Sequence, residues 1–349
     1  VDTAMVGSLG SAATAAVGLT ASTTWLFGGM FNAASIGFSV QVAQHLGAGR
    51  EKIARDVAWQ ALGFVGIFGL LLGGIAVALS FPLPALLGAE AAVRPQASLY
   101  FRIIACAMPF TLGANMFSAI LRCAGDTKTP MVLNLMINVL NVVLNFCLIY
   151  PARTLTLFGF SVPVWGAGWG VAGAAFASGC STAVVFFLFL LVMFRRRSPV
   201  QLKWKQRCGF QRECLLAVWR LGLPAALERA TLCVAQIVIT AVITGIGTVA
   251  VAANHLAVTA ESISYLPASG VAVAGTTLVG QTMGAGRKDL ARRFARMVSW
   301  MGIAIMTLGG AVLFAFAPQL IMIFSKDPEV ISLGAQVLRI VAFAEPLFG

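Results

Sequence analysis

Four acidic residues stand inside long apolar stretches of this sequence: Asp2, Glu228, Glu261 and Glu345. If these stretches cross a lipid bilayer, an ionised carboxylate at their centre costs at least about 2.5–3.5 kcal/mol on insertion scales. Such groups therefore face the interior of a helix bundle and usually have a function. A desolvated carboxyl group can take up a proton near neutral pH and release it when hydrated. The four acids are candidates for binding protons or cations.

Four asparagines lie on one stripe of the helix expected at 131–150. Asn134, Asn138, Asn141 and Asn145 follow one another at intervals of 4, 3 and 4 residues, which places them on one helix face. Amide side chains on such a stripe can hydrogen-bond to neighbouring membrane helices, at about 0.6–2 kcal/mol each, or supply oxygens to Na⁺ or a substrate. For Asn134 and Asn138 we favour helix association, and Asn138 is also a candidate cleft residue.

The composition is that of an integral membrane protein. The 349 residues are 59% hydrophobic and 10% charged, far from the usual composition of a soluble domain. The net charge of +12 does not indicate nucleic-acid binding, because the basic residues sit between apolar segments. The seven cysteines include no CxxC pair. We interpret them as small apolar packing residues and expect no metal site or disulfide framework.

An ungapped internal repeat divides the chain into two similar parts. QHLGAGREKIAR at 44–55 matches QTMGAGRKDLAR at 281–292, an offset of 237 residues that also pairs Gly73 with Gly310 and Pro109 with Pro346. A self-similar unit of this length indicates a duplicated domain. In a hydrophobic chain, it indicates a two-lobed transporter.

The repeat is broken at the acids. Asp2 pairs with Ile239, Thr24 with Glu261, and Met108 with Glu345. The residues that matter for mechanism are therefore expected among these asymmetric positions.

The predicted fold is an all-α polytopic membrane protein of two six-helix lobes, with about ten of twelve helices present. The expected domains are an N-lobe at 1–194, a basic cytoplasmic linker at 195–213 and a C-lobe at 214–349. Apolar runs of roughly 20 residues mark the spans. After a helix remnant at 1–6, they lie near 12–43, 57–81, 98–121, 131–150, 167–194, 214–243, 249–280 and 294–317, and another begins at 331.

Basic residues set the expected orientation. The connections at 45–56, 122–130, 195–213 and 284–296 carry 3, 2, 7 and 5 Lys or Arg residues, and the other connections carry at most 1 each. The basic set is therefore assigned to the cytoplasm. Six spans per copy make the repeat parallel, with its pseudo-twofold axis along the membrane normal. The linker is either a solvated, orientation-setting loop, which we favour, or a contact for anionic lipids.

The chain resembles the multidrug and toxic compound extrusion (MATE) transporters. The motifs that carry the resemblance are VDTAMVGSLG at the start, GAGR after the second span, LRCAGDTKTP at 121–130, NVLNVVLNFCLIY at 138–150, GVAGAAFAS at 170–178, LGLPAALERA and ESISYLPASGVAVAGTTLVGQ. The resemblance implies twelve helices around a central cleft. It also implies export of organic, often cationic, compounds driven by inward Na⁺ or H⁺.

The resemblance assigns a cation-coupling role to Asp2, Asn141, Asn145 and Ser178. Asp2 sits where the family's first helix carries its coupling aspartate. Asn141 and Asn145 fall where archaeal members place an asparagine and an aspartate of a Na⁺ site. Ser178 occupies a position at which those members have a threonine. Replacing that second acid by Asn145 weakens a hard-cation site, because neutral oxygens alone lack the compensating charge. We therefore expect H⁺ coupling through Asp2 in preference to Na⁺.

The C-lobe supplies further cleft candidates. Glu261 lies about 18 Å from the outer start of its helix, hence near the bilayer midplane, and Pro267 should bend that helix. Tyr265 can line a cleft for organic cations through π contacts. His255 can titrate near neutrality, although a packed histidine is the more common case. Glu228 is either a cleft acid or part of an amphipathic helix start.

Two other functions are weighed against cation-coupled export. A flippase for lipid-linked saccharides would need a strongly cationic cleft, whereas the cleft candidates here are acidic. A membrane enzyme would need a metal or nucleophile cluster that the sequence lacks, so no enzyme activity and no cofactor beyond the coupling ion are expected. We expect a monomer in the bacterial inner membrane that contacts lipids and small organic substrates but no nucleic acid. Because the second copy stops early, we expect the chain to be a fragment.

Overall fold

The computed structural model describes most of the chain. Asp2 lies outside the described residues, which are 5–6, 11–86, 93–157, 160–195, 198–203, 209, 211–245, 248–322 and 328–348. Packing divides the chain into two units. Unit 1 comprises Val1–Leu46 with Arg50–Leu227, and unit 2 comprises Gly47–Gly49 with Glu228–Gly349.

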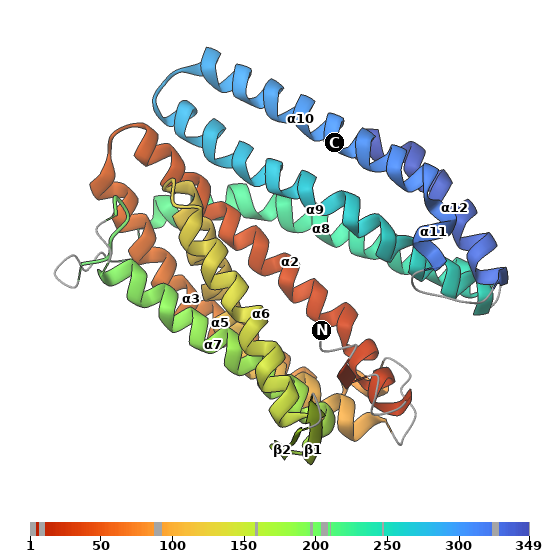
Figure 1. Ribbon diagram of the computed structural model, residues 1–349. Helices are drawn as coiled ribbons and strands as arrows, with labels where there is room; N and C mark the ends of the chain where they lie inside the picture. The colour runs from red at the N-terminus through yellow and green to blue at the C-terminus, as the bar shows by residue number, and fades with distance from the viewer. Residues whose placement is uncertain are drawn as a thin grey trace. The chain divides into compact units, whose positions relative to one another are not determined.

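Unit 1 is a helical bundle in which α5 is the central element (Figure 1). α5 packs against both α3 and α7, and α6 packs against α7. The helices of this unit are α2 (Ser11–Gly47), α3 (Glu51–Leu79), α4 (Leu83–Leu86), α5 (Arg94–Cys123), α6 (Lys128–Leu148) and α7 (Gly170–Arg195).

Unit 2 is a smaller set of helices in which α9, α10 and α12 pack against one another in pairs. They are α9 (Thr248–Gly284), α10 (Lys288–Ala315), α11 (Ala317–Met322) and α12 (Pro328–Phe348). The division between the units falls inside α8 (Arg212–Thr244). The first half of α8 belongs to unit 1, where the Gln41 side chain donates to the Cys214 carbonyl at 3.3 Å.

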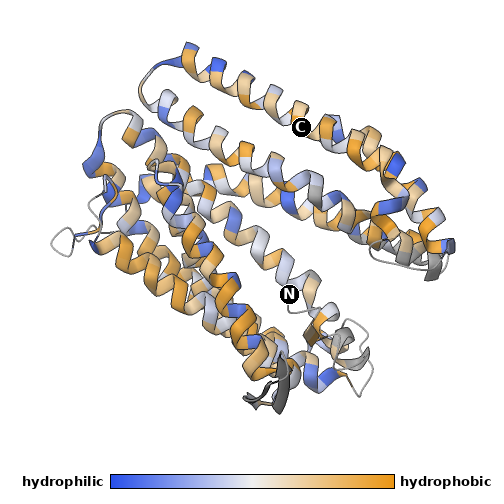
Figure 2. Ribbon diagram, viewed as in Figure 1, coloured by the Kyte–Doolittle hydropathy of each residue, from blue (hydrophilic) through white to orange (hydrophobic). Residues whose placement is uncertain are grey.

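The predicted helical membrane fold is confirmed. Within the described residues, eight helices are long and apolar enough to cross a membrane, or nine if the bent helix α9 counts as one span. Figure 2 shows hydrophobic residues along most of α3, α6 and α7. The helix starts that differ most from the prediction are those of α3 and α10, which begin at Glu51 and Lys288 instead of near 57 and 294. Their first turns are charged, and hydropathy alone does not recognise a charged turn that continues a helix beyond the apolar core.

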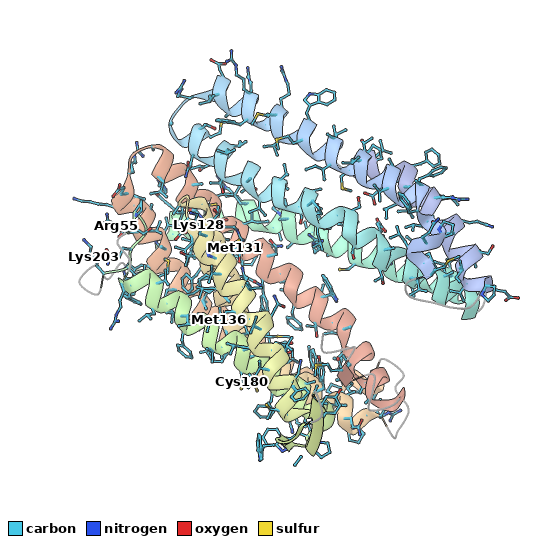
Figure 3. All side chains as sticks on the ribbon, in the orientation of Figure 1. Arg55, Lys128, Met131, Met136, Cys180 and Lys203 are labelled. Atoms are coloured by element: carbon cyan, nitrogen blue, oxygen red, sulfur yellow. The ribbon has the colours of Figure 1, made fainter. Side chains whose placement is uncertain are left out.

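Basic side chains gather at one end of unit 1. Figure 3 shows Arg55, Lys128 and Lys203 at the end away from the β1–β2 hairpin. The Arg55 guanidinium also donates to the Pro199 carbonyl at 3.0 Å, which ties the start of α3 to the connection after α7. This placement is what the expected orientation requires, because connections on the same side of the membrane must meet at one end of the bundle.

The connection expected at 151–166 contains a feature that hydropathy did not predict. It forms an antiparallel hairpin of β1 (Pro151–Leu157) and β2 (Phe160–Ala167), with Arg153 opposite Val164. The segment is rich in Thr, Val and aromatic residues, which favour strands. A span prediction based on apolar runs treats such a segment only as a gap between helices.

The internal repeat is visible in the backbone at the GAGR turns. Gly49 and Gly286 have φ angles of 70° and 73°, in the left-handed region. The Arg50 N–H donates to the His45 carbonyl at 2.8 Å, and the Arg287 N–H donates to the Thr282 carbonyl at 3.0 Å. Gly286, Arg287 and Thr282 lie at the repeat offset of 237 residues from Gly49, Arg50 and His45, respectively. The two copies therefore end one helix and begin the next with the same turn.

A second correspondence lies in the helix packing. A Cβ on Gly73 would lie 3.2 Å from the Ala105 carbonyl oxygen, and a Cβ on Gly310 would lie 2.7 Å from that of Ala342. Pro109 and Pro346, four residues after each carbonyl, have no N–H to donate to it. In each unit, a glycine on the neighbouring helix therefore makes room for a carbonyl that has lost its helical partner.

Replacing Gly49 with alanine tests the turn. The left-handed backbone should cost an L-residue about 1–2 kcal/mol, although no atom lies within 4 Å of the added Cβ. We expect a lower midpoint of thermal unfolding in detergent. Gly74→Ala is the matched control, because it adds the same methyl group within α3, also with no atom within 4 Å. Equal midpoints for the two variants would show that the turn conformation carries no such cost.

Candidate substrate and cation-coupling site

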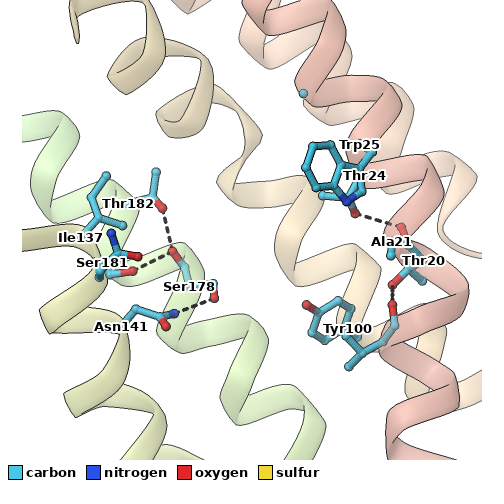
Figure 4. Close-up of a pocket in the computed structure, with 13 residues that line it drawn as sticks. Thr20, Ala21, Thr24, Trp25, Tyr100, Ile137, Asn141, Ser178, Ser181 and Thr182 are labelled. Atoms are coloured by element: carbon cyan, nitrogen blue, oxygen red, sulfur yellow. Dashed lines mark hydrogen bonds between the residues drawn. The ribbon is translucent and has the colours of Figure 1, made fainter. Parts of the chain in front are cut away.

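A cavity of about 500 Å³ lies inside unit 1, between α2, α5, α6 and α7. Figure 4 shows side chains from α2 on one side and from α6 and α7 on the other. The lining residues that the structure describes are polar or apolar, and none of them is charged: Val17, Thr20, Ala21, Thr24, Trp25, Gly28, Tyr100, Ile137, Asn138, Asn141, Ser178, Ser181 and Thr182. The described part of the cavity wall therefore presents hydroxyl and amide groups and no charge.

Three of the predicted coupling residues form one hydrogen-bonded chain beside this cavity. The Asn145 Nδ2 group donates to the Asn141 Oδ1 atom at 3.0 Å. The Asn141 Nδ2 group donates in turn to the Ser178 Oγ atom of α7 at 2.8 Å (Figure 4). Asn145 is fully buried. Asn141 and Asn145 thus share one face of α6, as their spacing predicts. The bond from Asn141 to Ser178 joins α6 to α7.

Hydroxyl groups on the cavity wall donate hydrogen bonds to backbone carbonyls of their own helices. Thr24 Oγ1 donates to the Thr20 carbonyl at 3.0 Å, and Thr182 Oγ1 donates to the Ser178 carbonyl at 2.8 Å. A hydroxyl that donates in this way keeps acceptor lone pairs. The wall can therefore accept hydrogen bonds from a substrate, and the aromatic rings of Trp25 and Tyr100 add π faces that favour cations.

The asparagines nearer the start of α6 make different contacts. Asn134 Nδ2 donates to Ser118 Oγ of α5 at 3.3 Å, and Arg122 donates to the same oxygen at 2.6 Å. This bond gives Asn134 the helix-associating role that its position suggests. Asn138 Nδ2 donates to the Asn134 carbonyl of its own helix at 3.1 Å. Asn138 thus lines the cavity without a described side-chain bond to another helix.

The first predicted coupling acid, Asp2, lies outside the described residues. The nearest described part of that segment packs on the end of α6. The Tyr150 hydroxyl donates to the Met5 carbonyl at 3.2 Å, and Val6 is fully buried in a cluster with Ile149 and Val17. The role of Asp2 stays a prediction.

The C-lobe candidates lie in unit 2. Glu228 is exposed on α8, Glu261 is half-buried on α9, and Tyr265 is half-exposed on α9. His255 lies in α9, but its side chain is outside the described part of the structure. The resemblance had assigned no role to Glu345, which the structure buries completely. The sequence had singled it out as one of the four acids in apolar stretches and as the asymmetric counterpart of Met108.

Comparison with known proteins identifies the family. The MatE family model matches residues 1–147 and 224–349, which cover both units. The chain belongs to the MatE family. The predicted family membership is confirmed, and the chain is a multi-pass membrane protein.

Relatives and solved structures agree with this assignment. The chain is 31% identical to the probable multidrug resistance protein NorM of Thermotoga maritima, over 97% of this chain and 70% of the relative. It is 27% identical to the uncharacterized transporter YisQ of Bacillus subtilis, over 99% of this chain and 73% of the relative. An outward-facing structure of a multidrug resistance MATE family transporter of the MOP superfamily matches with a TM-score of 0.88, 23% identity and coverage of 99% of this chain and 74% of that one.

The Asn141–Ser178 bond should stabilise unit 1 by a measurable pairwise energy. In a double-mutant cycle in detergent, we expect the losses in free energy of unfolding caused by Asn141→Ala and Ser178→Ala to be non-additive by about 0.6–1.7 kcal/mol. The matched control pairs Asn138→Ala with Ser178→Ala, because Asn138 lines the same cavity but bonds to its own helix. A coupling energy in the control as large as in the test cycle would contradict the assigned bond.

Proposed function

We propose that this protein is a secondary antiporter that exports small organic, often cationic, compounds by alternating access, coupled to inward H⁺ in preference to Na⁺. The observation that carries the proposal is the cavity of unit 1, whose described lining carries no charge and includes Asn141 and Ser178 of the Asn145–Asn141–Ser178 chain. Family membership supports a transport role. The names of several relatives, such as the probable multidrug resistance proteins NorM and YoeA, support drug-like substrates.

The hydrogen bonds of Asn141 support the preference for H⁺. Its oxygen accepts from Asn145 and its amide group donates to Ser178. A Na⁺ ion at this place would share the Asn141 oxygen with the Asn145 amide, whose N–H dipole points its positive end at that oxygen. It would also lack a carboxylate from position 145. Proton binding by a carboxyl group such as Asp2 involves neither disadvantage.

The lining of the cavity also favours export of organic compounds over a lipid-linked saccharide flippase. A pyrophosphate group needs several positive charges, and none of the described residues that line this cavity is charged. In the proposed function the protein is no enzyme, carries no cofactor beyond the coupling ion, acts as a monomer in the bacterial inner membrane, and contacts lipids but no nucleic acid.

A transport assay in cells tests the proposal. Energised cells that express the protein should extrude ethidium faster than control cells. Asp2→Asn should abolish this extrusion at equal expression, because the amide cannot exchange a proton. Asp289→Asn is the matched control, since Asp289 is an exposed acid in the first turn of α10.

Three results would count against the proposal. Normal extrusion by Asp2→Asn would remove the coupling role of Asp2. Loss of extrusion in Asp289→Asn would show that the assay responds to any lost acid. Equal ethidium retention in expressing and control cells would contradict drug export itself.

A further inference from the structure

The start of α10 carries an exposed group of basic side chains. A hollow of about 680 Å³ lies over the turn between α9 and α10, and Figure 2 shows hydrophilic residues where these two helices join. Its described lining contains four basic residues and one acid: Gly286, Arg287, Lys288, Asp289, Leu290, Arg292 and Arg293. Arg296 follows one turn later and is also exposed. The α10 basic cluster is defined here as Arg287, Lys288, Arg292, Arg293 and Arg296.

The charges of the α10 basic cluster are not used within the described part of the protein. None of its five members forms an ion pair or a side-chain hydrogen bond with another described residue. All five are exposed, and so is the one acid among them, Asp289. Exposed positive charges that the protein leaves unpaired raise the local concentration of anions.

The internal repeat shows that this charge is specific to unit 2. Residues 50–59 contain three basic and two acidic side chains, whereas the matching residues 287–296 contain five basic and one acidic. The acids Glu51 and Asp56 correspond to Lys288 and Arg293. The net charge of the same stretch therefore rises from +1 in unit 1 to +4 in unit 2.

Unit 1 uses the equivalent arginine within the protein. Arg55 donates to the Glu51 Oε2 atom at 3.0 Å and to the Pro199 carbonyl at 3.0 Å. Its counterpart Arg292 forms neither kind of bond with a described residue, and position 288 holds a lysine that cannot accept one. Basic residues at both turns set the orientation in the membrane, so orientation alone does not explain why unit 2 leaves its charges free.

The α10 basic cluster continues into a stripe of α10 that points away from unit 2. Five exposed residues follow one another at intervals of three or four: Arg293, Arg296, Trp300, Ala304 and Leu308. This spacing places them on one face of the helix. Leu308 is 69% exposed, and its counterpart Leu71 in α3 is 57% exposed. Both copies thus turn this face outward, where a membrane-spanning helix meets lipid chains.

Trp300 marks the level at which the charged part of the stripe gives way to the apolar part. It is 65% exposed and lies one turn, or about 6 Å along the helix axis, after Arg296. Tryptophan is enriched where membrane-spanning helices meet the headgroup region. A phosphate group held by Arg293 and Arg296 would therefore belong to a lipid whose acyl chains run past Trp300.

We propose that the α10 basic cluster binds the phosphate headgroup of an anionic phospholipid in the cytoplasmic leaflet, with the acyl chains along Trp300 and Leu308. Guanidinium groups match phosphate oxygens through paired hydrogen bonds. The connection at 284–296 belongs to the basic set assigned to the cytoplasm. Each basic residue near that surface strengthens attraction to anionic lipid by about fivefold. The lipid site is independent of the proposed export function.

Quenching of Trp300 fluorescence by brominated lipids tests this site directly. The purified protein is placed in phosphatidylcholine bilayers that contain either brominated phosphatidylglycerol or brominated phosphatidylcholine. The Trp300 signal is the difference between the wild type and Trp300→Phe. Half-maximal quenching should need an at least about fivefold lower mole fraction of the brominated phosphatidylglycerol. This preference should weaken at high salt, because ions screen exposed charges.

A double change tests the charges without a new kind of turn. Lys288→Glu with Arg293→Asp gives unit 2 the acids that unit 1 carries at the equivalent positions. The variant should therefore fold and lose the preference for phosphatidylglycerol. Lys128→Glu with Lys203→Glu is the matched control, because both lysines are exposed and the net charge changes equally. The control should keep the preference at Trp300.

Four outcomes would overturn the proposal. The first is equal quenching of Trp300 by the two brominated lipids in the wild type. The second is an unchanged preference in Lys288→Glu with Arg293→Asp. The third is loss of the preference in the control, which would show that only the overall charge matters. The fourth is loss of the preference when inorganic phosphate replaces chloride at constant ionic strength, because the cluster would then hold a soluble anion instead of a lipid.

Discussion

Helices that cross a bilayer gain little by exchanging lipid for protein around their apolar side chains, so close backbone approach and hydrogen bonds between helices must hold each unit together. Gly73 and Gly310 show this constraint at equivalent places. Each lets a carbonyl of the neighbouring helix, released by a proline, come close to its own backbone. The position of α5 against α3, and of α12 against α10, depends on these contacts. The cavity of unit 1 and the buried acid of unit 2 depend on that packing in turn.

The two units use the same backbone for different chemistry. Unit 1 fills the space between its helices with Phe27, Leu72 and Met108, and places amides and hydroxyls around a cavity whose described lining carries no charge. Unit 2 places Ser264 and Glu345 at the equivalent positions. Because apolar residues fill the equivalent positions of unit 1, this backbone arrangement does not itself require the polar pair.

Much of the fold could be predicted from the sequence, because the signals are local. Apolar runs located the membrane spans found among the described residues. The repeat paired the two GAGR segments, and the turns at Gly49 and Gly286 share one backbone conformation. The spacing of Asn141 and Asn145 predicted a shared face, and the structure joins both to Ser178. The hairpin at 151–167 was missed because strand propensity in a short connection is weaker than the hydropathy signal. The bond from Ser264 to Glu345 was missed because it joins residues 81 positions apart, which no periodic pattern reveals.

The central claim is that export is driven by protons through carboxyl groups that can become neutral inside the membrane. The most direct measurement uses the purified protein in liposomes loaded with a fluorescent organic cation, with the pH gradient and the Na⁺ gradient imposed separately. The account predicts that an inward proton gradient drives the cation out with no Na⁺ present, and that collapsing this gradient stops export. Export that continues after the proton gradient has collapsed, and that follows an inward Na⁺ gradient, would contradict it.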